Sequence, residues 1–272
     1  MKKMICGTGL LFIAAMILFP VWLTMVYAFI PPFDALRAFL NAESLKIIGN
    51  PTIEQFKTLI DRHTDIFFVL IRDFIWCVLT SAVQCLISVL CGYLLAKYRS
   101  RPVRFITRTF IWTLIVPLQT YLIPVQRIAH MLNLTAHPLI LYLMTAFSPF
   151  GIIFMRQVLL DFPDEYIMLY RMDDHRFITL LFHVIFPSCG RAVFVLFLLT
   201  FMEAWSMIEQ PLFFLTDKQR YPLSMILYRI RTEEPDVIFS ASLLSLLPVI
   251  LLFLVWMMLS FRKKISFQQD YL

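Results

Sequence analysis

Charged residues, glycine and the usual catalytic motifs are scarce in this sequence. Only 15% of its 272 residues are charged, and only six are glycine. No GxxxxGK[ST] run is present to cradle a nucleotide phosphate, and HExxH, GxSxG and CxxC are also missing. The five cysteines lack the spacing of metal ligands. The sequence therefore contains no motif for ATP hydrolysis, and any energy source is expected on another protein or in an ion gradient.

Apolar residues, in contrast, are abundant and lie in long runs. They make up 60% of the chain, more than a soluble domain can bury. A helix needs about 20 apolar residues to cross the ~30 Å hydrocarbon core of a bilayer. We predict an all-α membrane protein with a single transmembrane domain over residues 1–272. Its six transmembrane helices are expected at about 5–29, 74–96, 107–127, 137–155, 192–212 and 237–261.

The distribution of lysine and arginine predicts the orientation of these helices. Most of the 24 basic residues fall at the two ends of the chain, in the 97–108 segment and in the 156–191 segment. Basic residues collect on the cytoplasmic side of membrane proteins. Both termini are therefore expected in the cytoplasm, and the net charge of +6 reflects topology rather than binding of nucleic acid.

Prolines and acids predict local features of the helices. Pro117 and Pro124 are expected to bend the third helix, because each removes a backbone hydrogen bond. In the segment before the second helix, Pro51 followed by Glu54 is typical of the first turn of a short helix.

A polar segment at 163–187 interrupts the hydrophobic spans and has an amphipathic pattern. Apolar residues recur every three or four positions, acids follow Pro163, and Asp173-Asp174 indicates a turn between two short helices. From periodicity alone, the segment is typical of a helix that lies on the bilayer surface.

The same segment resembles the cytoplasmic coupling loop of permease subunits of ATP-binding-cassette (ABC) importers. In carbohydrate-uptake permeases related to the maltose system, this loop reads approximately P-x-E-L-x-E-A-A-x-x-D-G-A, followed further on by I-x-L-P. The matching positions are Pro163, Glu165, Asp173, Ile185 and Pro187, and Arg171 lies where a basic residue is common.

Two parts of the motif depart from the family pattern. The E-A-A core is Met168, Leu169 and Tyr170, so bulky side chains stand where alanines are usual. Asp174 takes the place of the glycine, and aspartate adopts the left-handed conformation of a turn at modest cost. Other stretches in the family's order extend the resemblance over about residues 50–262, with a core at 70–262; they include 92–97, 116–117, 123–124, 150–152 and 200–205.

The resemblance implies an ABC type I importer permease fold and a subunit of a sugar or oligosaccharide importer in the bacterial inner (plasma) membrane. Loop 156–191 is expected to receive the motion of an ABC ATPase dimer, which binds ATP and Mg²⁺. This chain itself is expected to bind no cofactor and not to be an enzyme. The other expected partners are a second permease subunit, usually a different chain in this family, an extracytoplasmic substrate-binding protein and the lipid bilayer.

Polar residues on two of the expected helices indicate a route for the substrate. A carboxylate near the bilayer centre, such as Glu203, costs about 2.5–3.5 kcal/mol and is expected to face protein or water. On a continuous helix, Glu203 shares a face with Ser206 and Gln210. Serine and glutamine also pack helices together through hydrogen bonds, which is the alternative role. The candidate pathway residues are Ser81, Gln84, Ser88, Thr200, Glu203, Ser206 and Gln210.

Two other functions are compatible with the sequence. A secondary transporter could use Glu203 as a proton or ion site, and it would work without an ATPase. A membrane enzyme could bind Mg²⁺ through the acidic cluster at 161–174, which contains Asp161, Asp164 and Glu165. However, the sequence has no DDxxD, and an amphipathic surface helix explains the same acids.

Overall fold

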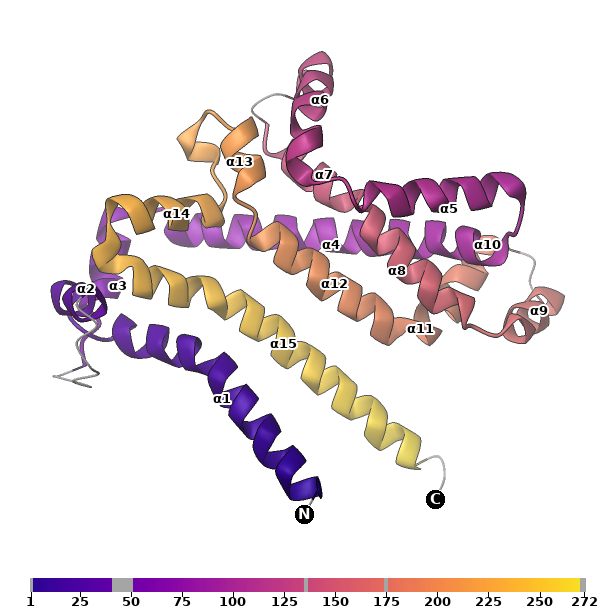
Figure 1. Cartoon of the computed structure of the whole chain (residues 1–272), viewed down its shortest axis with the longest axis horizontal. Helices are drawn as coiled ribbons and strands as arrows, with labels where there is room; N and C mark the ends of the chain where they lie inside the picture. Colours follow the sequence, from indigo (N-terminus) through magenta and orange to yellow (C-terminus); the bar gives the residue numbers. More distant parts are fainter. Residues whose placement is uncertain (1, 41–50, 135–136, 174–175, 270–272) are drawn as a thin grey trace. The chain divides into compact units, whose positions relative to one another are not determined.

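The computed structural model describes residues 2–40, 51–134, 137–173 and 176–269 (Figure 1). These residues form helices and short helical turns, without any β-strand among them. The chain divides into two compact units. Unit 1 combines Met1–Ile71 with Met225–Leu272, and unit 2 is Arg72–Ser224.

The long apolar runs form the membrane-spanning helices. Two long helices of unit 1, α1 (Lys2–Ala28) and α15 (Ile238–Gln269), each contain a candidate membrane span. The helix α4 (Ile66–Lys97) contains a third. The pair α7 (Leu139–Ala146) and α8 (Pro149–Leu160) makes a fourth. Two sharply bent helix pairs raise the number of candidate spans among the described residues from four to six. The predicted all-α membrane fold is confirmed.

Unit 1 is built on two antiparallel helices. Figure 1 shows α1 and α15 side by side and running in opposite directions, so that the N-terminal end of α1 and the C-terminal end of α15 are at the same end of the pair. At the other end, Tyr27 and Ala28 of α1 pack with Phe239 of α15, and Ala35 of the short helix α2 (Pro32–Leu40) completes this cluster.

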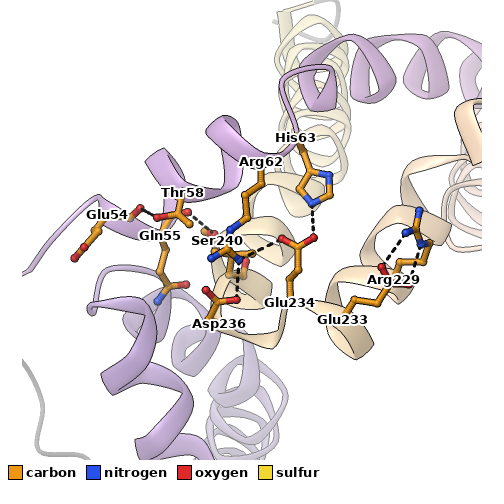
Figure 2. A network of polar contacts seen from close by, with 11 residues as sticks. Glu54, Gln55, Thr58, Arg62, His63, Arg229, Glu233, Glu234, Asp236 and Ser240 are labelled. Atoms are coloured by element: carbon orange, nitrogen blue, oxygen red, sulfur yellow. Dashed lines mark hydrogen bonds and ion pairs between the residues drawn. The ribbon is translucent and has the colours of Figure 1, made fainter.

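Polar contacts hold the connecting segments of unit 1 in place (Figure 2). The predicted short helix is confirmed as α3 (Glu54–Arg62). Its Arg62 pairs with Glu234 at 3.2 Å and with Asp236 at 3.1 Å. The hydrogen bond to Asp236 and the two nearby carboxylates raise the pKa of the Arg62 guanidinium. The buried Gln55 donates to the carbonyls of Tyr27 and Ile30, which fixes α3 beside the end of α1.

The core of unit 2 lies between α4, α8, the segment after residue 177 and α12 (Gly190–Trp205). Gly92 permits the closest approach in it, because a Cβ atom there would lie 2.8 Å from the backbone nitrogen of Arg156. The core residues are Cys85, Val89, Tyr93, Ala96, Met155, Leu159, Ile167, Leu180, Leu181, Ile185, Cys189 and Leu196.

The second predicted helix begins eight residues earlier than expected, at Ile66 rather than at 74. The uncharged run that predicts this helix begins after Arg72 and Asp73, but both charged side chains have partners within unit 2. Asp73 is 3% exposed; it accepts hydrogen bonds from Arg72 Nε at 3.0 Å and from the backbone N–H of Leu223. Arg72 Nη2 also donates to the Tyr221 carbonyl at 2.7 Å. A charged pair with such partners is compatible with a helix interior.

The third predicted helix, 107–127, is two helices that meet at 109°: α5 (Arg101–Thr113) and α6 (Leu118–Met131). Pro117 stands at the break as the residue that precedes α6, whereas Pro124 lies inside α6. Because a proline disfavours helical backbone in the residue before it, the helix ends ahead of Pro117 instead of bending around it.

The fourth and fifth predicted helices are also interrupted. Helix 137–155 is α7 and α8, with Ser148 before the new start, and it runs on to Leu160. Helix 192–212 ends at Trp205, and the separate helix α13 (Glu209–Phe214) follows. In a continuous helix the ring of Pro211 would clash with the carbonyl of residue 207, which accounts for the second break. The segment then continues through α14 (Leu223–Glu233) and a 3₁₀ turn (Pro235–Val237) to α15.

Candidate functional site

The predicted loop 156–191 is a series of short helices in unit 2. After α8 come α9 (Asp164–Asp173), α10 (Phe177–Leu180), a π-helical turn (Leu181–Ile185) and α11 (Phe186–Ser188). The two short helices expected on either side of Asp174 are therefore present.

Lys97, the last residue of α4, fixes the beginning of α9. Its Nζ donates to the Phe162 carbonyl at 2.7 Å and to Asp164 Oδ1 at 2.6 Å. The same atom lies 6.0 Å from the centre of the Phe162 ring. Hydrogen bonding from Lys97 lowers the pKa of the Asp164 carboxyl. The end of a membrane-spanning helix is thus tied directly to the start of the loop helix.

One face of α9 packs on the core of unit 2, and another is exposed. Ile167 is buried in the core, and Tyr170 packs partly against it. In contrast, Met168, Leu169 and Met172 are 66%, 63% and 78% exposed. Large apolar side chains on a helix that is anchored on one side form a surface suited to a protein partner or to lipid.

The second half of the loop is anchored more deeply. Leu180, Leu181 and Ile185 are each at most 2% exposed, so the closing element of the predicted motif is a core element. The ring of Phe177 lies 5.6 Å from that of Tyr93 on α4. Motion of this segment is therefore coupled to α4 through direct side-chain packing.

The structure places most of the predicted loop residues. Pro163, Glu165 and Pro187 are exposed, and Ile185 is buried. Arg171 and Asp173 belong to α9, but their side chains lie outside the described part of the chain, as does all of Asp174. The role of these residues in coupling stays a prediction.

Comparison with known proteins identifies the family to which the chain belongs. Residues 88–266 match the family described as the binding-protein-dependent transport system inner membrane component. The chain belongs to this family. It is thus a membrane permease subunit of an ABC transporter, as the resemblance implied, and not an enzyme.

Two curated relatives of the permease match nearly its whole length. The arabinooligosaccharide transport system permease AraQ of Bacillus subtilis is 24% identical over 243 residues, which are 87% of this chain and 85% of the relative. AraQ of Halalkalibacterium halodurans is 21% identical over 252 residues, or 90% and 88% of the two chains.

A solved structure confirms the fold of the permease. It is a bacterial ABC transporter involved in the import of the acidic polysaccharide alginate, and one of its chains superposes with a TM-score of 0.73 at 17% identity. The match covers 94% of the permease and 95% of that chain. The type I importer permease fold expected from the sequence is therefore present.

The candidate pathway residues of α4 are buried, and two of them bind backbone groups. Gln84 accepts a hydrogen bond from the Ser148 N–H at 3.2 Å and donates to its carbonyl at 3.0 Å, at the break between α7 and α8. Ser81 donates to the Cys77 carbonyl. Ser88, like the other two, is at most 1% exposed. Gly151 makes the contact of Gln84 with Ser148 possible, since a Cβ atom at Gly151 would lie 2.2 Å from Gln84 Nε2. These contacts favour helix packing for Ser81 and Gln84, whereas the buried Ser88 Oγ has no hydrogen-bond partner among the described residues.

The candidates after residue 199 do not form one stripe. Thr200 and Gln210 are buried, whereas Glu203 and Ser206 are exposed. Because α12 ends at Trp205, Gln210 is not on the same helix as Glu203. Glu203 is thus the exposed carboxylate of α12, and its place in a substrate route stays a prediction.

Sequence reasoning missed the contacts of three residues. The distribution of basic residues places Lys97 only in the 97–108 segment, and the predicted second helix begins after Asp73. Ile167, which anchors α9, lies outside the predicted apolar stripe, whereas Leu169, a member of that stripe, is exposed. The neighbouring Arg72 is a signal in the sequence for a buried, paired Asp73, because an opposite charge stands beside it at the edge of an apolar run.

Among the residues described, no three His, Cys, Asp or Glu side chains gather in a way that could hold a metal ion.

Proposed function

We propose that the permease imports an oligosaccharide and receives the motion of an ATPase through α9 and the segment up to Pro187. In this proposal both termini and the loop are cytoplasmic. ATP and Mg²⁺ are bound by a dimer of ABC ATPases, and a substrate-binding protein delivers the sugar to the outer face. A second permease chain of different sequence completes the pore.

The arrangement of α9 carries the proposal of coupling. Its exposed apolar face, with Met168, Leu169 and Met172, offers a surface to a partner. Its other face is fixed to α4 and to the core by Lys97 and Ile167. A displacement of α9 would thus be passed to a membrane-spanning helix through short contacts rather than through a loose linker.

The named activities of the relatives support a carbohydrate as the substrate. The two AraQ proteins belong to arabinooligosaccharide transport systems, and the structural relative takes part in the import of alginate. These substrates are all chains of sugar units. We infer the same chemical class for the permease.

Substitution of Glu165 tests the coupling role. Glu165 is exposed in the first turn of α9, so its replacement is expected to leave the core of unit 2 intact. For Glu165→Ala in the assembled transporter, we expect uptake per ATP hydrolysed to fall at least about fivefold, the lower end of typical coupling effects. The measurement is sugar uptake and ATP hydrolysis by the same proteoliposomes.

Asp161→Ala is the matched control, because Asp161 is an exposed acid that ends α8 outside α9. It should keep the normal ratio of uptake to hydrolysis. The coupling role is refuted if Glu165→Ala, together with Asp173→Ala, transports like the unmodified complex. Failure of cross-links between residues 166–176 and a nucleotide-hydrolysing subunit in native membranes would also contradict it.

A further inference from the structure

A basic cavity lies at the end of α4, separate from the exposed face of α9. Its volume is about 460 Å³, and it is lined by the end of α4, the residues that follow it, α5 and α8. Four arginines take part in the lining: Arg99, Arg104, Arg108 and Arg156. No carboxylate belongs to the lining.

The four guanidinium groups have no carboxylate of the described residues in direct contact, although Arg99 is near enough to help lower the pKa of Asp164. Within the part of the chain that the structure describes, none of the four forms an ion pair. The neighbouring acid Asp164 is already bound to Lys97 at 2.6 Å. Arg156 adds a second observation, because its Nε is buried and has no hydrogen-bond partner. A buried donor without a partner in the chain is stabilised by an added acceptor, such as a ligand oxygen or a water molecule.

The fold assembles this cluster from two directions. Gly92 lets the backbone of α8 approach α4, which brings Arg156 beside the end of that helix. From the other side, α5 begins at Arg101 and presents Arg104 and Arg108, four residues apart, on one face. The first turn of α5 adds the partial positive charge of a helix N-terminus. The site is therefore complementary to a compact anion with several oxygen acceptors, of which phosphate is the closest match.

The surroundings of the cavity indicate where such an anion comes from. α5 has 13 residues and is only about 20 Å long at 1.5 Å per residue, too short to cross the hydrocarbon core. Its basic beginning is followed by exposed apolar side chains, with Phe105 at 72% and Trp112 at 69%. Tyr98, which lines the cavity, is also exposed. Basic and aromatic residues at the end of a membrane-spanning helix are typical of the headgroup region.

We propose that this cavity binds the phosphate group of an anionic phospholipid. Arg104, Arg108 and Arg156 hold the phosphate oxygens, and the apolar side of α5 contacts the acyl chains. The inference rests on the cavity and on the membrane location of the family, and not on the choice of substrate or on the role of α9.

Lipid retention by the assembled transporter tests the proposal. The complex is purified through a tag on this chain, and bound phosphatidylglycerol and phosphatidylcholine are quantified by native mass spectrometry after incubation with each lipid. We expect selective retention of phosphatidylglycerol. Arg104→Gln should weaken it about fivefold, the effect of one basic residue near an anionic membrane surface. Arg156→Gln should weaken it at least as much.

Arg101→Gln is the matched control, because it removes the same charge from the same helix but from a residue outside the lining. It should change retention less than twofold. If Arg156→Gln prevents assembly, Arg104→Gln decides the question, since Arg104 is exposed and on a different helix.

Three results would overturn the proposal. The first is equal retention of the two lipids, or equal loss in the control and in Arg104→Gln. The second is displacement of phosphatidylglycerol by millimolar inorganic phosphate, which would identify a free anion as the ligand. The third is loss of the ATPase subunit from Arg104→Gln without any change in lipid retention, which would assign the cavity to a protein interface.

Discussion

Single residues of unit 2 hold its short helices in place through polar contacts. Lys97 donates hydrogen bonds to two groups at once, the Phe162 carbonyl and the Asp164 carboxylate. Its side chain is 14% exposed, whereas that of Asp164 is 64% exposed. The carbonyl contact is therefore the stronger of the two, because exposed ion pairs are screened by water and contribute little.

Replacement of Lys97 is expected to loosen α9 without unfolding the protein. In Lys97→Met the Phe162 carbonyl loses its donor, which should destabilise the docked helix by about 1–3 kcal/mol. Hydrogen exchange of the α9 amides in the purified complex should become faster, while exchange in α12 stays unchanged. Arg191→Met, another basic residue of the loop region, serves as control. Equal protection of α9 in Lys97→Met and the control would contradict this role of Lys97.

The same pair predicts a dependence on pH. The pKa of Asp164 is lowered in the folded protein, so its contribution is present above the ordinary aspartate pKa of about 3.9. It is lost as the pH falls through the lower folded-state value. Protection of α9 should therefore decrease on acidification below that range, and Lys97→Met should lack this step.

Gly92 sets the distance between α4 and α8. A Cβ atom there would meet the Arg156 nitrogen at 2.8 Å and the Met155 backbone at 3.0 Å, and neither helix backbone can move aside cheaply. Gly92→Ala should lower the thermal stability of the complex, with a free-energy loss of about 1–3 kcal/mol. Gly190→Ala is the control, because a Cβ atom at Gly190 has open space around it. Equal melting temperatures of the two variants would show that the helices can separate without loss.

At the scale of helices, breaks decide which polar residues share a surface. Glu203 is exposed on α12, whereas Glu209 lies on α13 and accepts a hydrogen bond from Gln119 of α6 at 2.8 Å. The two carboxylates are therefore separated by a change of helix and by different partners. Only Glu203 remains available for an added ligand on α12.

Substitution of each carboxylate distinguishes the two sites. Glu203→Ala is expected to raise the KM or lower the rate of sugar uptake by several-fold while the complex still assembles. Glu209→Ala should leave uptake kinetics unchanged, since that carboxylate is engaged by Gln119. Uptake measured over a range of sugar concentrations in proteoliposomes gives both values. Unaltered kinetics in Glu203→Ala would assign that residue to packing between subunits.

At the scale of the whole chain, the antiparallel arrangement of α1 and α15 predicts that both chain ends lie on one side of the membrane. We expect cysteines introduced at Lys3 and Lys264 to react with a membrane-impermeant reagent only after the cells are opened. A cysteine at Lys57, exposed on α3, should react in intact outer-membrane-permeabilised cells. Labelling of one terminus from outside would contradict the orientation. The native cysteines that the structure describes are buried or half-buried and set the background.

The sequence was sufficient for the class of fold, because long uncharged runs have few alternatives to transmembrane helices. The motif that keeps Pro163 and Glu165 in order coincides with the start of α9, and its role in coupling stays a prediction. Helix boundaries were less predictable. The pairing of Asp73 with the Leu223 N–H joins residues 150 positions apart, and no local pattern reports such a contact. The polar stripe assigned to a pathway depended on a continuous helix, which Pro211 prevents.

The residues that open and close unit 2 are fastened to each other. Arg72 donates a hydrogen bond to the Tyr221 carbonyl at 2.7 Å, and Asp73 accepts one from the Leu223 N–H. These two hydrogen bonds join the beginning and the end of unit 2. Exchange of residues 72–224 as one block would keep both contacts within the exchanged segment, and its two peptide junctions would lie within α4 and α14. Such a chimera would carry its own α9, so comparison with the parent permeases would show whether the choice of ATPase follows this segment.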